Sequence, residues 1–191
     1  SIMNKSLIAL AVLGSLTGAA LAQSSVTLYG RIDGGLGKEF AGKAQMISSY
    51  KESTMWGLRG QEDLGGGLKA SFNFEQGVNM ENGALTGGDT GAWNRAAWVG
   101  LSGGFGEFSM GRMTTPQNRT MGVFDLNGSA NNTSALRNLG LEADGNLGGS
   151  RANSQLMYTS PKLGGFQARA AVVMKEDKGS APAAGTADAR K

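Results

Sequence analysis

The stretch Leu68-Lys69-Ala70-Ser71-Phe72-Asn73-Phe74-Glu75 alternates between apolar or small side chains and polar ones. Successive side chains of a β-strand point to opposite faces, so a period of two predicts a strand with one apolar and one polar face. The alternation is weaker at 55–61 and ambiguous at 93–102, where Arg95 shares a phase with Val99. From this pattern we expect seven strands, at residues 26–36, 55–61, 68–76, 93–102, 106–111, 151–159 and 166–175.

The connections between these segments are of two kinds. Short, glycine-rich turns lie at 64–67, 102–106 and 163–165, and long polar excursions lie at 40–53, 77–92 and 113–150. Short turns at one end of a sheet and long loops at the other are typical of outer-membrane β-barrels, whose polar phase lines a wet lumen. A soluble β-sandwich alternates in the same way, so the alternation alone does not choose between the two.

The first 22 residues read as an export signal. Lys5 gives a positive head, residues 7–13 form an apolar core, and residues 20–22 form a small-residue cleavage site. This is typical of a secretory signal peptide, with residues 1–2 as an upstream remnant. No later stretch approaches the ~18 apolar residues of a transmembrane helix. An exported chain of this kind is expected to be either soluble or a membrane β-barrel.

The composition excludes several function classes. The 191 residues include no Cys and no His, which removes thiol nucleophiles, disulfides, imidazole bases and most zinc or iron sites. The formal net charge of +3 is far from the strongly basic footprint of a nucleic-acid-binding protein. No paired-carboxylate motif stands out. We therefore expect neither an enzyme nor a metal, a cofactor or a nucleic-acid partner.

Several runs of sequence, taken in order and at their spacings, resemble a known family. They are SSVTLYG at 24–30, GLRGQEDLGGGLKA at 57–70, FGEFSMGR at 105–112, RANSQLMY at 151–158 and SPKLGGF at 160–166. Together they resemble the general diffusion porins of β-proteobacteria, in the Gram-negative porin family of the Neisseria and Omp type. The likeness extends from the signal to about residue 175.

The resemblance implies an all-β, transmembrane antiparallel β-barrel of sixteen strands that assembles as a homotrimer in the lipid of the cell outer membrane. It implies passive diffusion of small hydrophilic solutes and ions, with a mild anion preference. Residues 23–191 would form the N-terminal portion of the barrel, and 113–150 would be the constriction loop that folds into the pore. Because about seven strands with a free edge do not close a barrel, we expect this sequence to be part of a longer chain.

The resemblance also suggests the charges that line the pore. The family places lumen arginines opposite the constriction loop, and Arg95 and Arg151 match two such positions. A third falls at Met55, a departure that weakens the expected anion preference. Arg31, in the polar phase of the first strand, is a candidate substitute, and Arg59 is a further candidate for a pore charge. The alternative is that these arginines are ordinary lumen charges paired with Asp or Glu.

The long loop carries carboxylates that are candidates for the opposite side of the constriction. Asp125 is the first of these, followed by Glu142 and Asp144. Facing the arginines, they would create a transverse field; the alternative is solvated loop charge. Two other functions stay open: a non-channel outer-membrane barrel such as an adhesin or structural protein, and a soluble exported β-sandwich.

Four aromatic residues are candidates for the girdles found at membrane–water interfaces. They are Tyr29, Trp56, Trp98 and Tyr158. Ordinary packing between strands is the alternative for each of them.

Overall fold

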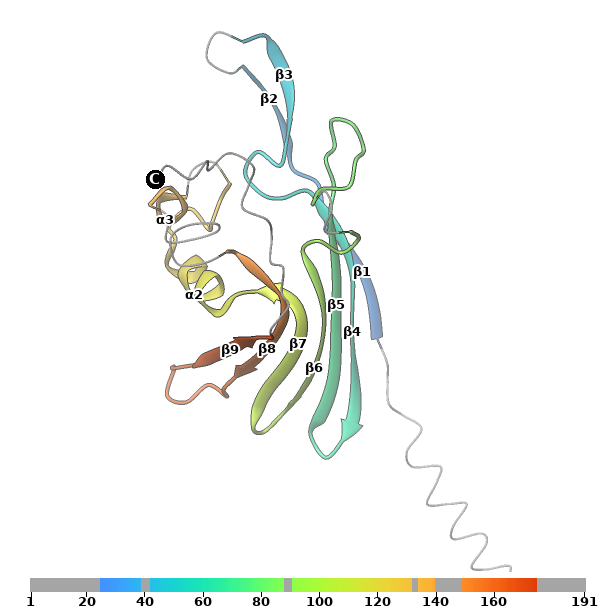
Figure 1. Ribbon diagram of the computed structural model, residues 1–191, viewed down its shortest axis with the longest axis vertical. Helices are drawn as coiled ribbons and strands as arrows, with labels where there is room; N and C mark the ends of the chain where they lie inside the picture. Colours follow the sequence, from blue (N-terminus) through green and yellow to red (C-terminus); the bar gives the residue numbers. More distant parts are fainter. Residues whose placement is uncertain (1–24, 39–41, 88–90, 132–133, 140–148, 175–191) are drawn as a thin grey trace, which may run out of the picture.

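The computed structural model describes residues 25–38, 42–87, 91–131, 134–139 and 149–174. Its main feature is a curved, seven-stranded antiparallel sheet with strand order β1-β4-β5-β6-β7-β8-β9 (Figure 1). The predicted signal at 1–22 lies outside the described residues, as do Glu142 and Asp144. The strands are β1 (Ser25–Arg31), β4 (Met55–Gly65), β5 (Leu68–Gly77), β6 (Ala96–Gly103), β7 (Gly106–Thr114), β8 (Arg151–Thr159) and β9 (Arg169–Val173).

The register of the sheet keeps side chains of one type together. Phe72 on β5 lies opposite Val99 on β6, Val99 lies opposite Met110 on β7, and Met110 lies opposite Leu156 on β8. This apolar row runs across four strands because each strand alternates with the same period and pairs with its neighbour in phase. The seven predicted antiparallel strands are confirmed.

The first predicted strand, 26–36, is wrong in its extent. The structure ends β1 at Arg31 and begins a separate strand, β2 (Gly34–Lys38), within the predicted strand. β2 pairs with β3 (Ala44–Ser48), which lies in the loop predicted at 40–53, and the two form a separate hairpin (Figure 1). Asp33 causes the break. Its carboxylate accepts hydrogen bonds from the backbone N–H groups of Lys51 and Glu52 at 3.0 and 3.2 Å. The alternation continues in phase through this bend, so the sequence pattern does not reveal it.

The two faces of the sheet are inverted relative to those of a water-soluble protein. On the apolar phase, Leu28 is 69% exposed and Met110 is 57% exposed. On the polar phase, Ser109, Gln155 and Met157 are at most 2% exposed. A large, bare apolar face is unusual for a soluble monomer and indicates that something other than water covers it.

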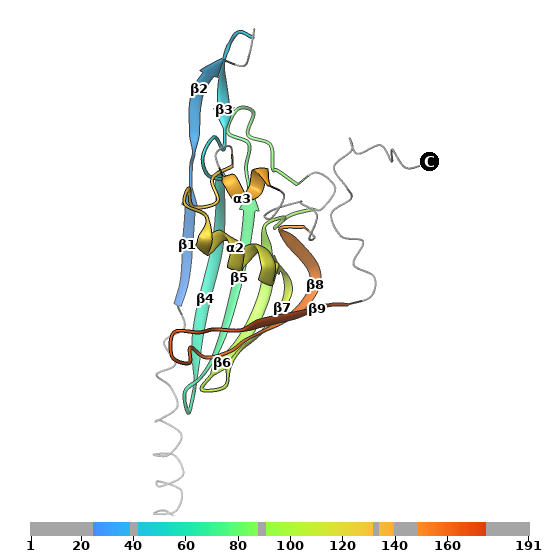
Figure 2. The ribbon, with the colours of Figure 1, turned by 90° about the vertical axis from the view of Figure 1, so that its left-hand side faces the viewer.

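The long connection between β7 and β8 contains two helices. They are α2 (Pro116–Phe124) and α3 (Ala135–Asn138), which lie on the side toward which the sheet curls (Figures 1 and 2). α2 packs against β9. Arg119 on α2 is partly buried, and this burial, together with the nearby charge of Arg169, lowers the pKa of Arg119.

The connections divide between the two ends of the sheet as the sequence predicts. The turns that join β4 to β5, β6 to β7 and β8 to β9 lie at one end, and the three long connections lie at the other (Figure 1). We refer to these as the turn end and the loop end of the sheet.

Aromatic side chains cluster toward both ends of the apolar face. Toward the loop end, the ring centroids of Trp56 and Trp93 are 5.2 Å apart. Toward the turn end, those of Phe108 and Tyr158 are 4.8 Å apart. Trp56 and Tyr158 therefore occupy the positions expected of girdle residues.

Tyr29 and Trp98 do not belong to these clusters, contrary to one of our expectations. The Tyr29 hydroxyl donates hydrogen bonds to the side chains of Asn73 and Glu75, and Trp98 lies opposite Asn73 in the register. Both residues therefore lie in the polar phase of the sheet.

The bend at Asp33 generates a prediction about pH. Hydrogen bonding from the backbone of Lys51 is the main cause of a lowered Asp33 pKa. The ionised Asp33 carboxylate therefore orders the connection fully above the usual carboxyl pKa of about 3.9. This contribution is lost as the pH falls through the lower pKa that Asp33 has in the folded protein. Hydrogen–deuterium exchange at the amides of Lys51 and Glu52 should be several-fold slower at pH 7 in the natural protein than in an Asp33→Asn variant. This difference should vanish at acid pH, and equal protection at pH 7 would contradict the assignment.

Candidate functional site

Arginine side chains gather on the polar face at the loop end of the sheet. Arg95, just before β6, has its Nε 2.5 Å from Oε1 of Glu75, and its side chain is 16% exposed. Arg151, the first residue of β8, donates from Nε to the Arg95 carbonyl at 2.9 Å. Two of the arginines predicted to line a pore are therefore brought together, although 56 positions separate them in the sequence.

A further set of contacts extends this cluster from β5 over β4 to β1. Tyr29 donates its hydroxyl to Oε2 of Glu75 at 2.9 Å, and Arg59 lies over the Tyr29 ring, 4.9 Å from its centroid. Gly57 makes this possible, because it lies between Tyr29 and Glu75 in the register and a Cβ there would be 3.0 Å from the Tyr29 ring. Sequence reasoning missed Tyr29 and Glu75 as members of the site. The glycine in the polar phase was the available signal.

Arg112 is another member that the sequence analysis missed. Simple alternation places it in the apolar phase with Met110. The structure has a register shift between Gly111 and Met113, and Gly111 has a φ of 129°. This β-bulge turns Arg112 toward the polar face, where its Nε donates to the Asn94 carbonyl at 2.6 Å. A second donor, Nη1, reaches the Asn153 side chain at 2.5 Å.

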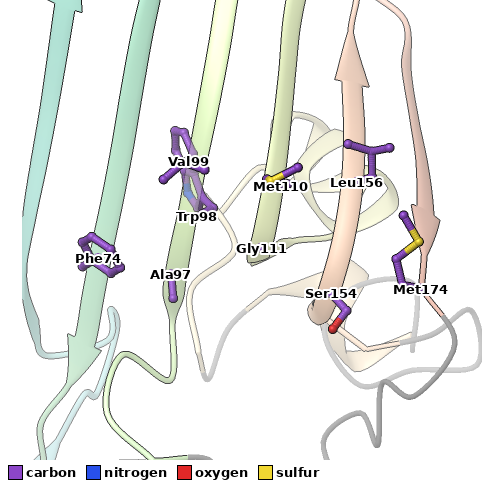
Figure 3. Close-up of a pocket in the computed structure, with 9 residues that line it drawn as sticks. All are labelled: Phe74, Ala97, Trp98, Val99, Met110, Gly111, Ser154, Leu156 and Met174. Atoms are coloured by element: carbon purple, nitrogen blue, oxygen red, sulfur yellow. The ribbon is translucent and has the colours of Figure 1, made fainter.

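The bulge also leaves a hollow on the opposite, apolar face. Small side chains at Ala97 and Ser154 and the missing side chain of Gly111 form its floor, between larger apolar neighbours such as Phe74 and Leu156 (Figure 3). The hollow has a volume of about 420 Å³. The apolar phase is therefore continuous but not flat.

Arg31 lies apart from Arg95 and Arg151. Its Nη2 is 3.0 Å from a carboxylate oxygen of Glu52, and its Nε donates to the Ser53 carbonyl at 3.2 Å. It is about two-fifths exposed. Both Arg31 and Arg95 thus have carboxylate partners, which is the alternative that the sequence left open for them.

Asp125 follows α2 within the long loop. Its carboxylate accepts hydrogen bonds from the Ser134 hydroxyl and from the backbone N–H of Asn127. The bond from Ser134 is the main cause of a lowered Asp125 pKa. In these contacts Asp125 stabilises its own loop and does not meet the arginines. Its role as a pore charge stays a prediction.

The same loop reaches across the polar face to the first long connection. Asn131 donates from its backbone to the Lys51 carbonyl and from its side-chain amide to the Ser49 carbonyl, both at 2.8 Å. A segment that leaves β7 is thereby attached next to β1 and β4 (Figure 2). The described part of this loop is therefore attached to the first long connection at one point and packs against β9 through α2.

Two further properties concern the described residues only. They contain no helix that combines the length and apolar character needed to cross a membrane. Within the same ranges, no three His, Cys, Asp or Glu side chains come together in a way that could hold a metal ion.

Comparison with known proteins gives a consistent family. The family model described as Gram-negative porin matches residues 9–191. Outer membrane porin protein 32 of Delftia acidovorans is 41% identical over 175 residues, covering 87% of this chain and 48% of the relative. Major outer membrane protein P.IB of Neisseria gonorrhoeae is 34% identical over 187 residues, covering 93% of this chain and 50% of the relative. The chain spans about half the length of these relatives.

A solved structure shares the fold. The anion-selective porin from Comamonas acidovorans superposes with a TM-score of 0.62 at 34% identity, covering 77% of this chain and 46% of the other. The seven-stranded sheet is therefore a section of a porin β-barrel wall.

The bulge at Gly111 can be tested by substitution. In Gly111→Ala, the new Cβ would lie 2.9 Å from the Trp98 Cα, on a backbone conformation that an L-residue rarely adopts. We expect the free energy of unfolding to fall by about 1–3 kcal/mol, measured by urea unfolding in detergent micelles. Gly104→Ala is the matched control, because that turn position has no heavy atom within 4 Å of the added Cβ. Equal stability of the two variants would mean that the bulge is not under this constraint.

Proposed function

The chain belongs to the Gram-negative porin family, and from this membership we propose that the protein is a passive diffusion channel for small hydrophilic solutes and ions. The protein lies in the cell outer membrane. The observation that carries the proposal is the inversion of the two faces, with Leu28 and Met110 bare on one side and a polar face enclosed by the curve on the other.

This inversion matches the two solvents of an outer-membrane channel. The apolar face meets hydrocarbon, which cannot hydrogen-bond to unpaired backbone groups, so the sheet has to close on itself. In the described part, β1 and β9 each pair along one edge only. We propose that further strands join these edges to complete a barrel of sixteen strands, and that the barrels assemble as trimers.

The loop at 113–150 is proposed as the constriction of the channel. Support comes from its position inside the curve of the sheet, the packing of α2 against β9, and the attachment of Asn131 to the first long connection. A loop fixed at both of these places narrows the space in front of the arginine cluster.

The arginine cluster is proposed to give a mild anion preference. Guanidinium groups stay charged at any relevant pH, and charges on low-dielectric walls raise the local concentration of counter-ions. Arg95 and Arg151 lie together behind the loop, Arg112 is a third contributor, and Arg31 is a weaker one toward the outside. Glu75 opposes them through its ion pair with Arg95, which keeps the preference moderate.

Conductance tests the proposed function directly. Protein extracted from outer membranes and added to planar lipid bilayers should give discrete, stable current steps. A folded, membrane-inserted protein that produces no steps would contradict the channel and favour a non-channel outer-membrane barrel.

Charge substitution tests the assigned residues. Two unit charges about 4 Å apart in water interact by about 1 kcal/mol, which changes a local ion concentration by about fivefold. We therefore expect Arg95→Gln with Arg151→Gln to shift the reversal potential in a KCl gradient toward cations, with a permeability ratio changed by about two- to fivefold.

Glu75→Gln should shift the reversal potential the opposite way, because it removes the charge that opposes Arg95. Lys162→Gln removes a positive charge from the exposed turn between β8 and β9, away from the cluster. It should change neither the reversal potential nor the permeability ratio. If the arginine variants keep the natural reversal potential, the cluster does not set selectivity, although the channel itself would stand.

A further inference from the structure

A second feature of the polar face lies closer to the turn end than the arginine cluster. It is a groove of about 430 Å³, within the size range of about 300–1,000 Å³ that small-molecule sites occupy. We propose that this groove is a docking site for a neutral, polyhydroxylated ring such as a sugar on its way through the channel. This inference rests on the proposed function.

Two neighbouring rows of the sheet build the groove. In the first row, Thr27, Arg59, Asn73 and Trp98 lie opposite one another across β1, β4, β5 and β6. The next row toward the turn end contains Ser25, Gln61, Ser71 and Gly100 in the same order. Both rows belong to the polar phase, so their side chains rise from the same face.

Gly100 provides the space for an aromatic platform. A Cβ at Gly100 would lie 3.3 Å from Cζ3 of Trp98 and 3.1 Å from the Ser71 hydroxyl oxygen. The Trp98 indole thus lies along its own strand, over the glycine and beside Ser71, and lines the groove. An aromatic ring laid against a wall in this way offers its face to the apolar C–H side of a sugar ring.

The polar groups of the groove keep free hydrogen-bonding capacity. In the described part of the chain, the side chains of Thr27, Gln61 and Ser71 form no hydrogen bonds, and the Arg59 guanidinium lies over the Tyr29 ring without a hydrogen bond or ion pair. Tyr29 is itself held by its hydrogen bonds on β5, so Arg59 is positioned with its donors available. Hydroxyl groups of a ligand both donate and accept, and match this mixture of guanidinium, amide and hydroxyl groups.

The charge balance favours a neutral ligand. Glu107 also lines the groove, so the lining combines one carboxylate with one guanidinium, that of Arg59. A small anion would gain from Arg59 and lose to Glu107, whereas a neutral ring can accept from the first and donate to the second. The groove therefore differs in chemistry from the arginine cluster, where positive charge predominates among the named side chains.

The test measures sugar binding by the protein in bilayers. Maltose is the neutral probe and sodium gluconate the anionic one, and glycerol at equal viscosity corrects for slower ion movement. Maltose should reduce the single-channel current in a saturable way. Trp98→Leu should weaken this apparent affinity by about tenfold, and Trp98→Phe, which keeps a ring, should weaken it much less.

Matched variants separate the groove from general damage. Trp56→Leu removes an indole from the opposite, apolar face and should leave maltose binding unchanged. If Trp98→Leu fails to insert, Arg59→Gln replaces it and should weaken maltose binding several-fold, with Lys162→Gln as its control.

Three results would overturn the inference: a conducting channel that maltose does not block saturably, equal maltose affinity in the natural and Trp98→Leu proteins, or a Trp98-dependent block by gluconate alone. If the protein gives no current steps, the proposed function fails separately. Maltose binding in the groove is then tested by intrinsic tryptophan fluorescence. Maltose should change the emission of the natural protein and should not change that of Trp98→Phe.

Discussion

The structure depends on one constraint: seven strands alternate with the same period and pair in phase, so that each face of the sheet keeps its general character from strand to strand. The row from Phe72 through Val99 and Met110 to Leu156 is apolar throughout. A slip of one residue in any pairing would exchange the faces of a strand. Once the rows are fixed, the bare apolar face and the enclosed polar face follow.

The seven strands could be predicted from the sequence because the alternation of apolar and polar residues is a local property of each segment. The sequence did not reveal the places where one residue ends or bends a strand while the alternation of apolar and polar residues continues. Asp33 ends β1 by accepting backbone hydrogen bonds from a segment 18 residues further on, while the alternation continues unchanged. Contacts of that kind depend on how a connection closes, which the period of a strand does not encode.

Gly111 likewise changes the site in a way that the alternation does not show, because it turns the next residue, Arg112, toward the other face. A charged side chain on the lipid face costs a barrel about 2–4 kcal/mol at the bilayer midplane and less near the interfaces, so Arg112 in the apolar phase would be unfavourable. The bulge removes it from that face and adds it to the arginine cluster.

Arg95 and Arg151 were identified from their resemblance to family positions. Tyr29 and Glu75 were missed, because only the register shows that Gly57 lets one reach the other across β4. The partners of Asp125 lie within its own loop, a detail that spacing alone cannot supply.

The attachment of Asn131 to the backbone at Ser49 and Lys51 joins segments about 80 positions apart. The acceptors are backbone carbonyls, so the bond does not depend on which side chains the outer connection carries. The side chains of the first long connection can therefore vary widely while the loop between β7 and β8 keeps its point of attachment. A change of backbone length in that connection would move the attachment point of Asn131, and in the proposed channel it would therefore change the width of the pore.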